Sequence, residues 1–127
     1  MNKISVTHIS NEHSDWLRNL DFYKQEIGIL KGRLTEIAGK NTHADVLKQV
    51  EHFENQFTVQ TDNTERLMHD IKHNIKVVAK EAEAAKAGYV DGELLTQHRT
   101  LGQQYETEQK IVNELRHSFN QFAAEWM

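Results

Sequence analysis

The sequence predicts an all-α fold, an elongated antiparallel three-helix bundle with coiled-coil-like packing. Composition is the first reason: the 127 residues include 6 glycines and no proline, too few chain breakers for a β-rich fold. The second reason is that apolar residues recur in alternating steps of three and four along three long segments. The third is a mean hydropathy of −0.71, which is typical of an elongated protein with a large surface and excludes a membrane span.

The first helix is expected over residues 10–38. Ser10 is its predicted N-cap, and Gly39 suits a left-handed C-cap. Its core positions are His13, Trp16, Leu20, Tyr23, Ile27, Leu30, Leu34 and Ile37.

The second helix is expected over residues 42–87. Thr42 and Asp45 resemble a capping box at its start, and Gly88 is the predicted stop. Its core positions are Val46, Val50, Phe53, Phe57, Gln60, Thr64, Leu67 and Ile71, followed by a one-residue shift of phase to Ile75, Val78, Ala82 and Ala85.

A four-helix bundle is the alternative, in which the middle helix breaks near residue 62. The stretch 61–64 is rich in capping residues, and Asp62 stands three residues before Glu65, as in a weak capping box. Against a break, the apolar spacing passes through this stretch in register, and no glycine or proline lies between Asn41 and Gly88. The single long helix is therefore the preferred prediction.

The third helix is expected over residues 91–126. Its core positions are His98, Leu101, Tyr105, Glu108, Val112, Leu115, Phe119, Phe122 and Trp126. Antiparallel helices pair outward from their connection, so Ile71 is expected to face Glu108 and Val78 to face Leu101. One end of the bundle then collects the aromatic side chains, and the other end is thinner and more polar.

Two core residues, His13 and Glu108, are the first candidate metal ligands. The predicted pairing brings them within about one helical turn of each other. A histidine and a glutamate inside a bundle can form half a metal site or an acid–base pair. The alternative is a buried polar layer that fixes the register of the helices. If His13 is buried and neutral, acid is expected to loosen the polar end.

A second candidate group for a divalent metal comprises Glu65, His69 and His73. The two histidines are four residues apart, a spacing that lets two imidazoles on one helix face chelate one ion. Because Ile71 is expected to point inward, both histidines are expected to point outward into solvent.

The order of five residues resembles that of hemerythrin-like bundles: His8, Glu12, His69, His73 and His98. The class is set aside because His8 and Glu12 are expected at a frayed N-terminus and His69 and His73 on the outside. Ferritin-like bundles need Glu-x-x-His on two helices, and this spacing occurs once here.

The outward side of the first helix carries a candidate interaction face. It consists of Phe22, Gly28, Ile29 and Gly32, two large apolar side chains beside two glycines. Each glycine disfavours a helix interior by roughly 1 kcal/mol relative to alanine. The face is suited to close approach of another helix, from a second copy or from a different helical protein.

Net charge and the absence of known motifs exclude several classes of function. With 15 basic and 19 acidic residues, the net charge of −4 gives no basic surface for nucleic acid. No phosphate loop, nucleophile elbow or metalloprotease helix occurs, so no enzyme activity and no organic cofactor are expected. No signal peptide is recognised, and a cytoplasmic location without membrane association is expected.

Several short stretches together resemble a family of short, uncharacterised, all-helical proteins from bacteria. They are His13-x-x-Trp16, Phe22-Tyr23-x-x-Glu26, Glu51-His52-Phe53-x-Asn55-Gln56 and the closing Trp126-Met127. The resemblance covers most of the chain and implies a bacterial cytoplasmic protein, but it assigns no activity and no functional residue.

The sequence therefore predicts a non-enzymatic helical bundle that serves as an interaction or structural module and associates with itself. The alternative is a metal-binding helical bundle with His and Glu ligands.

Overall fold

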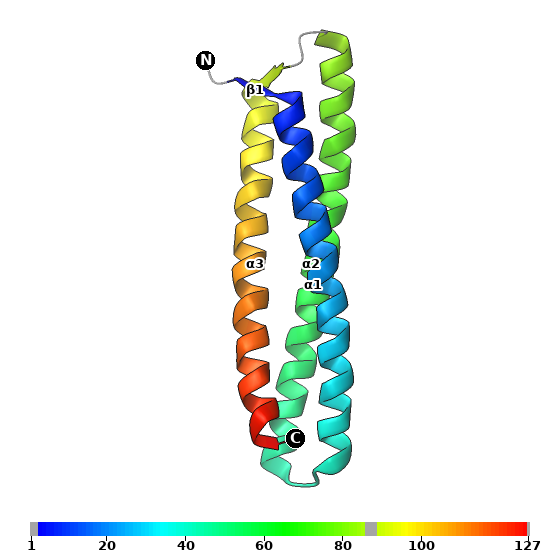
Figure 1. Ribbon diagram of the computed structural model, residues 1–127, viewed down its shortest axis with the longest axis vertical. Helices are drawn as coiled ribbons and strands as arrows, with labels where there is room; N and C mark the ends of the chain where they lie inside the picture. The colour runs from blue at the N-terminus through cyan, green and yellow to red at the C-terminus, as the bar shows by residue number, and fades with distance from the viewer. Residues whose placement is uncertain (1–2, 86–88, 127) are drawn as a thin grey trace.

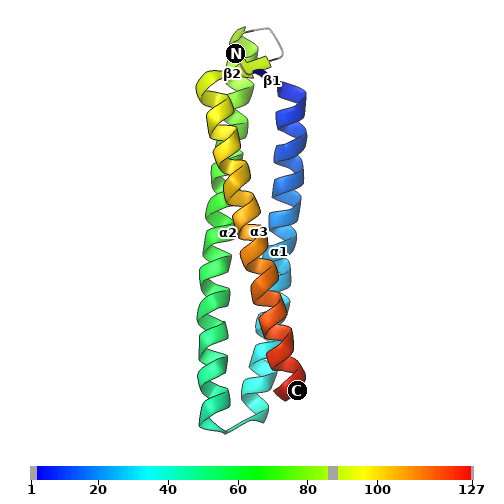
Figure 2. The same ribbon diagram turned by 90° about the vertical axis from the view of Figure 1, so that its left-hand side faces the viewer.

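The computed structural model describes residues 3–85 and 89–126. Three helices lie along one long axis: α1 (Val6–Lys40), α2 (Ala44–Ala85) and α3 (Gly92–Trp126) (Figure 1). α1 and α3 run parallel, α2 runs antiparallel to both, and each helix contacts the other two. The predicted three-helix bundle is confirmed. Figure 2 shows α3 inclined across the other two helices.

Two three-residue strands, which the sequence did not predict, close one end of the bundle. β1 (Lys3–Ser5) pairs antiparallel with β2 (Tyr89–Asp91), with Ile4 opposite Val90. We call this the β end, and we call the opposite end, where residues 41–43 connect α1 to α2, the loop end. The pairing joins the start of α1 to the start of α3.

α2 is one unbroken helix, so the four-helix alternative is wrong. It passes through residues 61–64 without interruption, and the Thr64 side chain is fully buried. The Thr58 and Thr61 hydroxyls donate to the carbonyl oxygens of Glu54 and Phe57, at 3.0 and 2.8 Å. Their polar groups are therefore satisfied within the helix, and they provide no reason for the chain to leave it.

The predicted shift of phase after Ile71 is also wrong. Asn74 is 5% exposed and continues the three-four pattern, whereas Ile75 is 36% exposed. The apolar character of Ile75 suggested the shift, but Asn74 is accepted in the core because polar partners from the other helices surround it.

The ends of α1 differ from the prediction. The helix begins four residues before Ser10, with Ser5 as the N-cap, whose hydroxyl accepts the His8 backbone N–H at 3.0 Å. It continues through Gly39 to Lys40, so Gly39 is not a left-handed cap. Instead the Asn41 side chain donates to the Ile37 carbonyl at 2.8 Å, satisfying a terminal acceptor.

At the start of α2 the cap is His43 rather than Thr42. The His43 ring nitrogen Nδ1 accepts the Asp45 backbone N–H at 3.3 Å. α3 begins at Gly92, which has a φ of +57° and needs a glycine for this conformation. The predicted helix end at residue 87 and the predicted stop at Gly88 lie outside the described residues.

An aromatic cluster fills the core near the loop end, as predicted. The Phe53 ring lies 5.1 Å from the Phe122 ring and 5.5 Å from the Phe119 ring, and Phe57 lies 5.4 Å from Phe119. These centroid distances are typical of favourable aromatic pairs. At the β end the apolar core is smaller, with Ile9 and Val78 as its buried members.

The pairing of α2 with α3 is displaced by one heptad from the prediction. Glu108 contacts Thr64 instead of lying beside Ile71. Val78 packs in a cluster with Leu94 rather than facing Leu101. The expected pairing assumed a tight turn between the helices, but α2 extends beyond the start of α3, and β2 lies between them in the chain (Figure 1).

Gly102 accommodates the Trp16 side chain against α3. A Cβ added at Gly102 would lie 3.2 and 3.4 Å from two ring carbons of Trp16. The indole has little freedom to move, because it stacks on His98 and on Tyr105.

We therefore expect Gly102→Ala to lower the free energy of unfolding by about 1 kcal/mol, since overpacking outweighs the gain in helix propensity. Gly39→Ala is the matched control, because a Cβ there meets nothing within 4 Å. It should raise the free energy of unfolding by several tenths of a kcal/mol (~0.5). Urea denaturation measures both, and equal gains in the two variants would contradict the packing argument.

Candidate functional site

Four residues of α1 that are spaced seven apart each contact a side chain of α3. Three of the contacts are polar, and one places a guanidinium over an aromatic ring. The pairs are Glu12–His98 (2.9 Å), Asn19–Tyr105 (2.8 Å), Glu26–Arg116 (2.7 Å) and Arg33–Phe119 (6.0 Å to the ring centroid). We call them the α1–α3 contact series. In three of the four pairs the numbers differ by 86, so the two parallel helices stay in register over most of their length.

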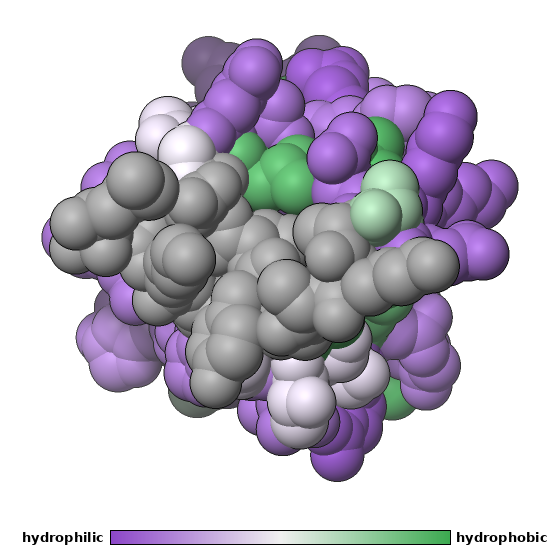
Figure 3. All heavy atoms as spheres, turned by 90° about the horizontal axis from the view of Figure 1, so that it is seen from above, coloured by the Kyte–Doolittle hydropathy of each residue, from purple (hydrophilic) through white to green (hydrophobic). Residues whose placement is uncertain are grey.

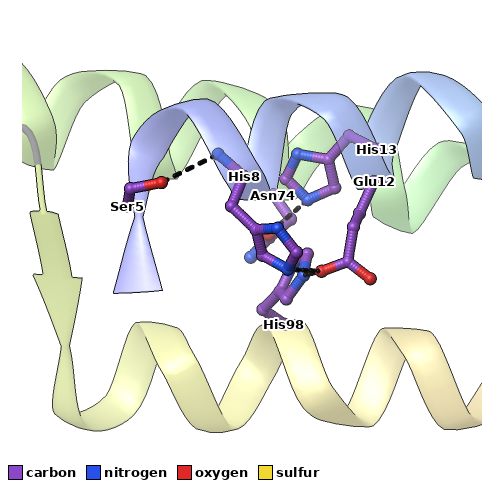
Figure 4. Close-up of polar contacts among 6 residues, drawn as sticks. All are labelled: Ser5, His8, Glu12, His13, Asn74 and His98. Atoms are coloured by element: carbon purple, nitrogen blue, oxygen red, sulfur yellow. Dashed lines mark hydrogen bonds and ion pairs between the residues drawn. The ribbon is translucent and has the colours of Figure 1, made fainter. Parts of the chain in front are cut away.

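The first contact of the series belongs to a cluster of polar side chains near the β end. We define this histidine cluster as His8, Glu12, His13, Asn74 and His98 (Figure 4). His13 Nε2 donates to the Asn74 side-chain oxygen at 3.0 Å, and both residues are buried. The Asn74 amide nitrogen donates in turn to Gln97 at 3.4 Å, so one chain of hydrogen bonds joins all three helices.

Glu12 links the two other histidines of the cluster. Its Oε1 atom lies 2.8 Å from His8 Nε2 and 2.9 Å from His98 Nε2, and Figure 4 shows both rings beside this carboxylate. A carboxylate is an acceptor, so each neutral ring carries its proton on Nε2. His98 Nδ1 is buried without a hydrogen-bond partner in the described structure.

Trp16 separates the histidine cluster from the rest of the core. Its ring stacks on His98 at 4.8 Å and on Tyr105 at 5.9 Å. The His13 and His98 rings meet edge to face at 5.2 Å. Burial lowers the pKa of His13, and the nearby His98 lowers it further, while the Asn74 hydrogen bond and Glu12 oppose the shift.

Solvent reaches one side of the histidine cluster. The Glu12 side chain is 37% exposed, while that of His98 is 4% exposed. A cavity of about 340 Å³ opens beside these two residues, between α1 and α3. Seen from above the β end, the described side chains at the outer edge of the molecule are mostly hydrophilic (Figure 3). Solvent therefore reaches the Glu12 carboxylate while the imidazole rings of His13 and His98 stay buried.

Glu108 forms a second buried polar layer, closer to the middle of the bundle. The Thr64 hydroxyl donates to its Oε2 atom at 2.9 Å. The Gln60 amide nitrogen, turned toward the carboxylate, donates to both oxygens at 2.9 Å. Burial raises the pKa of Glu108, and the hydrogen bond from Thr64 partly opposes this.

The structure does not bring His13 and Glu108 together. His98, which contacts His13, stands ten residues before Glu108 in α3, which is about 15 Å along the helix. The two residues were predicted to lie close together because the predicted pairing of α2 with α3 differs from the observed pairing by one heptad. Each residue instead belongs to its own hydrogen-bonded layer.

The second predicted metal group lies on the surface. His69 and His73 are exposed, as expected from the position of Ile71. The Glu65 carboxylate pairs with Lys24 Nζ at 3.0 Å, across to α1. Within residues 3–85 and 89–126, no group of three or more His, Asp or Glu side chains has an arrangement that could hold a metal ion.

The sequence analysis placed His8 and Glu12 at a frayed terminus and so missed the contacts of Glu12 with His8 and His98. The error came from starting the helix at Ser10, whereas Ser5 caps it and both residues lie on regular turns. One signal was present in the sequence. The residues at positions 12, 19, 26 and 33 are polar or charged and share one heptad position, as expected for a line of contacts with a neighbouring helix.

The predicted interaction face is exposed on α1. Phe22 is 57% exposed and Ile29 is 67% exposed, the two largest values among the large apolar residues of the described chain. Gly28 and Gly32 are also exposed, and a Cβ added to either would meet nothing within 4 Å. Packing inside this chain therefore does not explain the two glycines.

Comparisons with known proteins add no family or relative. No family model matches the chain, and neither a curated protein nor a solved structure is similar enough to match it. Membership of the bacterial family named above stays a prediction. None of the described helices combines the length and the apolar character that crossing a bilayer requires. Fold and site geometry thus define the protein as an antiparallel three-helix bundle with two buried polar layers.

The lowered pKa of His13 fixes the sign of one pH effect. Below the unfolded value near 6.5, the unfolded state binds more protons than the folded state, so stability falls as the pH falls. Above that value the contribution of the neutral ring is complete. We expect His13→Gln to remove about 1 kcal/mol of the loss in unfolding free energy between pH 7.5 and 5.5. Thermal or urea unfolding at the two pH values measures the difference.

His73→Gln is the control for that experiment, because His73 is exposed and its loss changes the net charge equally. It should keep the pH dependence of the wild type. If His13→Gln retains it as well, the buried ring does not cause the acid sensitivity.

The raised pKa of Glu108 predicts an effect of the opposite sign. Above the unfolded value near 4.5, the unfolded state releases a proton that the folded state retains, so this residue lowers stability as the pH rises. Relative to wild type, Glu108→Gln should gain about 1 kcal/mol of stability between pH 5 and 7.5. The exposed neighbour Glu106→Gln serves as the control, and equal changes in the two variants would argue against burial as the cause.

Proposed function

We propose that this protein is a non-enzymatic helical-bundle module that associates with itself through the outer face of α1. The interaction face comprises Phe22, Gly28, Ile29 and Gly32. We place the module in the bacterial cytoplasm on the basis of the resemblance described above. Its role is to present a rigid helix surface to a partner.

The observation that carries the proposal is the pair of glycines in the middle of α1. Each disfavours the helix by roughly 1 kcal/mol relative to alanine, and Gly28 and Gly32 are far from both ends. Neither is required by packing within the chain, since both face open space. Small residues at such positions allow a second helix to approach closely, and the exposed Phe22 and Ile29 provide apolar contact area.

The other exposed apolar side chains do not form a comparable face. Leu47, Val59 and Ile75 are the remaining large ones among the described residues, and all three lie on α2. They are separated from one another by more than ten residues, so each is an isolated exposed side chain of a kind common on protein surfaces.

The two buried polar layers support a structural role for the bundle rather than chemistry. Their hydrogen-bonding groups are directed at one another, with His13 on Asn74 and Glu108 on Thr64. Such layers disfavour other registers, because a slip would leave buried polar groups without partners. We do not extend the proposal to metal binding, because the described candidate ligands have other partners or face solvent separately.

If the face associates, the wild-type protein should be a dimer at micromolar concentration in analytical ultracentrifugation. Ile29→Glu should shift it to monomer, because a charge replaces a buried apolar contact. Val59→Glu is the matched control, as it introduces the same charge at an exposed apolar site on another helix. A wild-type protein that remains monomeric at high concentration would refute the proposal.

The glycines provide a second readout. Gly28→Ala and Gly32→Ala should each raise the free energy of unfolding of the monomer by about 0.5–1 kcal/mol, measured by urea denaturation of dilute protein. The same variants should weaken dimerisation, because a methyl group blocks close approach. If the variants are more stable but dimerise as strongly as the wild type, the glycines are not part of the interface.

A further inference from the structure

We infer that the partner of the α1 face is a second copy of this chain, bound antiparallel, with the two-fold axis passing near residue 27. This inference rests on the proposed function and adds the orientation and the register of the two copies.

Six exposed residues follow one another along the outer side of α1 in steps of four and three. Such spacing is that of the contact positions in a two-helix coiled coil. They form a second stripe, opposite the one that faces the core of the bundle. The outer stripe consists of Arg18, Phe22, Gln25, Ile29, Gly32 and Glu36.

In an antiparallel pair, residues near the start of the stripe on one copy lie opposite residues near its end on the other copy. A two-fold axis near residue 27 sets Phe22 opposite Gly32 of the second copy, a large side chain against none. It also sets Arg18 opposite Glu36 of the second copy, and symmetry repeats each contact. At the centre, Ile29 of one copy packs on the aliphatic part of Gln25 of the second copy. Shape and charge are therefore complementary in the same register.

A parallel pair fails on both counts. Each residue would face its own copy, so Arg18 would meet Arg18 and Glu36 would meet Glu36, with like charges opposed. Phe22 would meet Phe22 while Gly32 met Gly32, which leaves a crowded layer and an empty one.

An antiparallel pair shifted by one heptad toward the C-terminus of α1 is less complementary. It sets Phe22 opposite Gly39 and Gln25 opposite Glu36. Arg18 would then lie beyond Lys40, the last residue of α1 in the second copy. The charge pairing is lost, and fewer residues of the stripe are covered.

Arg18 is able to make the new contact. It pairs with Asp15 of its own helix, and the two side chains are 71% and 65% exposed. Exposed pairs of this kind contribute little and exchange readily. The Glu36 side chain is exposed as well.

The 127-residue chain contains no cysteine, so single introduced thiols report the geometry without interference. A disulfide forms only when the two Cα atoms are within about 7 Å. We expect an oxidised mixture of Arg18→Cys and Glu36→Cys to give a cross-linked heterodimer, with neither variant cross-linking efficiently alone. A mixture of Arg18→Cys with Asp62→Cys, an exposed position on α2, is the control and should not cross-link.

Charge exchange tests the register in the uncrosslinked protein. Arg18→Glu should weaken dimerisation about tenfold, because two attractive pairs become repulsive. The double variant Arg18→Glu/Glu36→Arg should restore the wild-type dimerisation constant, since it exchanges the two charges. Sedimentation equilibrium at low salt measures all three proteins.

The outcomes separate this inference from the proposed function. Cross-linking of Arg18→Cys with itself, or failure of the double variant to recover, overturns the antiparallel register while an Ile29-dependent dimer still supports the module. A dimer that Ile29→Glu does not disrupt overturns both. Self-association absent at every concentration tested likewise overturns both.

Discussion

The fixed offset between the parallel helices α1 and α3 is the constraint on which the rest of the structure depends. A short connection holds α1 against α2, whereas α2 extends past the start of α3 and β2 lies between these two helices in the chain. The β1–β2 pairing and the α1–α3 contact series set the axial position of α3, and the series runs from Glu12 on His98 at one end to Arg33 on Phe119 at the other. A slip by one heptad would separate these partners, and Glu12 and His98 would lose their hydrogen bond near a buried ring.

The two buried polar layers fix this arrangement, and their contributions to stability change with pH in opposite directions. Burial favours the uncharged form in both, which lowers the pKa of His13 and raises that of Glu108. Acidification therefore opposes the first layer, and deprotonation opposes the second. Apolar residues of similar size would avoid these penalties but would accept more than one register. The smaller apolar core at the β end leaves the histidine cluster with less support than the aromatic cluster gives at the loop end.

Glycine serves the bundle in two distinct ways. Gly102 lets Trp16 pack against α3, and there the reason lies within the chain. Gly28 and Gly32 face open space, and no contact among the described residues accounts for them. The same residue type in a helix thus marks an internal contact in one place and an external surface in another. Only the location of neighbouring side chains distinguishes the two.

The periodicity of apolar residues alone determined the number of helices, the unbroken α2 and the outward positions of His69 and His73, because side chains on a regular helix follow its rotation. The exposure of Phe22 and Ile29 on one face of α1 was predictable for the same reason. Tertiary structure decided the axial pairing, and with it the partners of His13, Glu108 and Glu12. Every heptad register satisfies the same apolar pattern, so the choice among them depends on contacts between distant segments, namely the pairing of β1 with β2 and the polar contacts from α1 to α3.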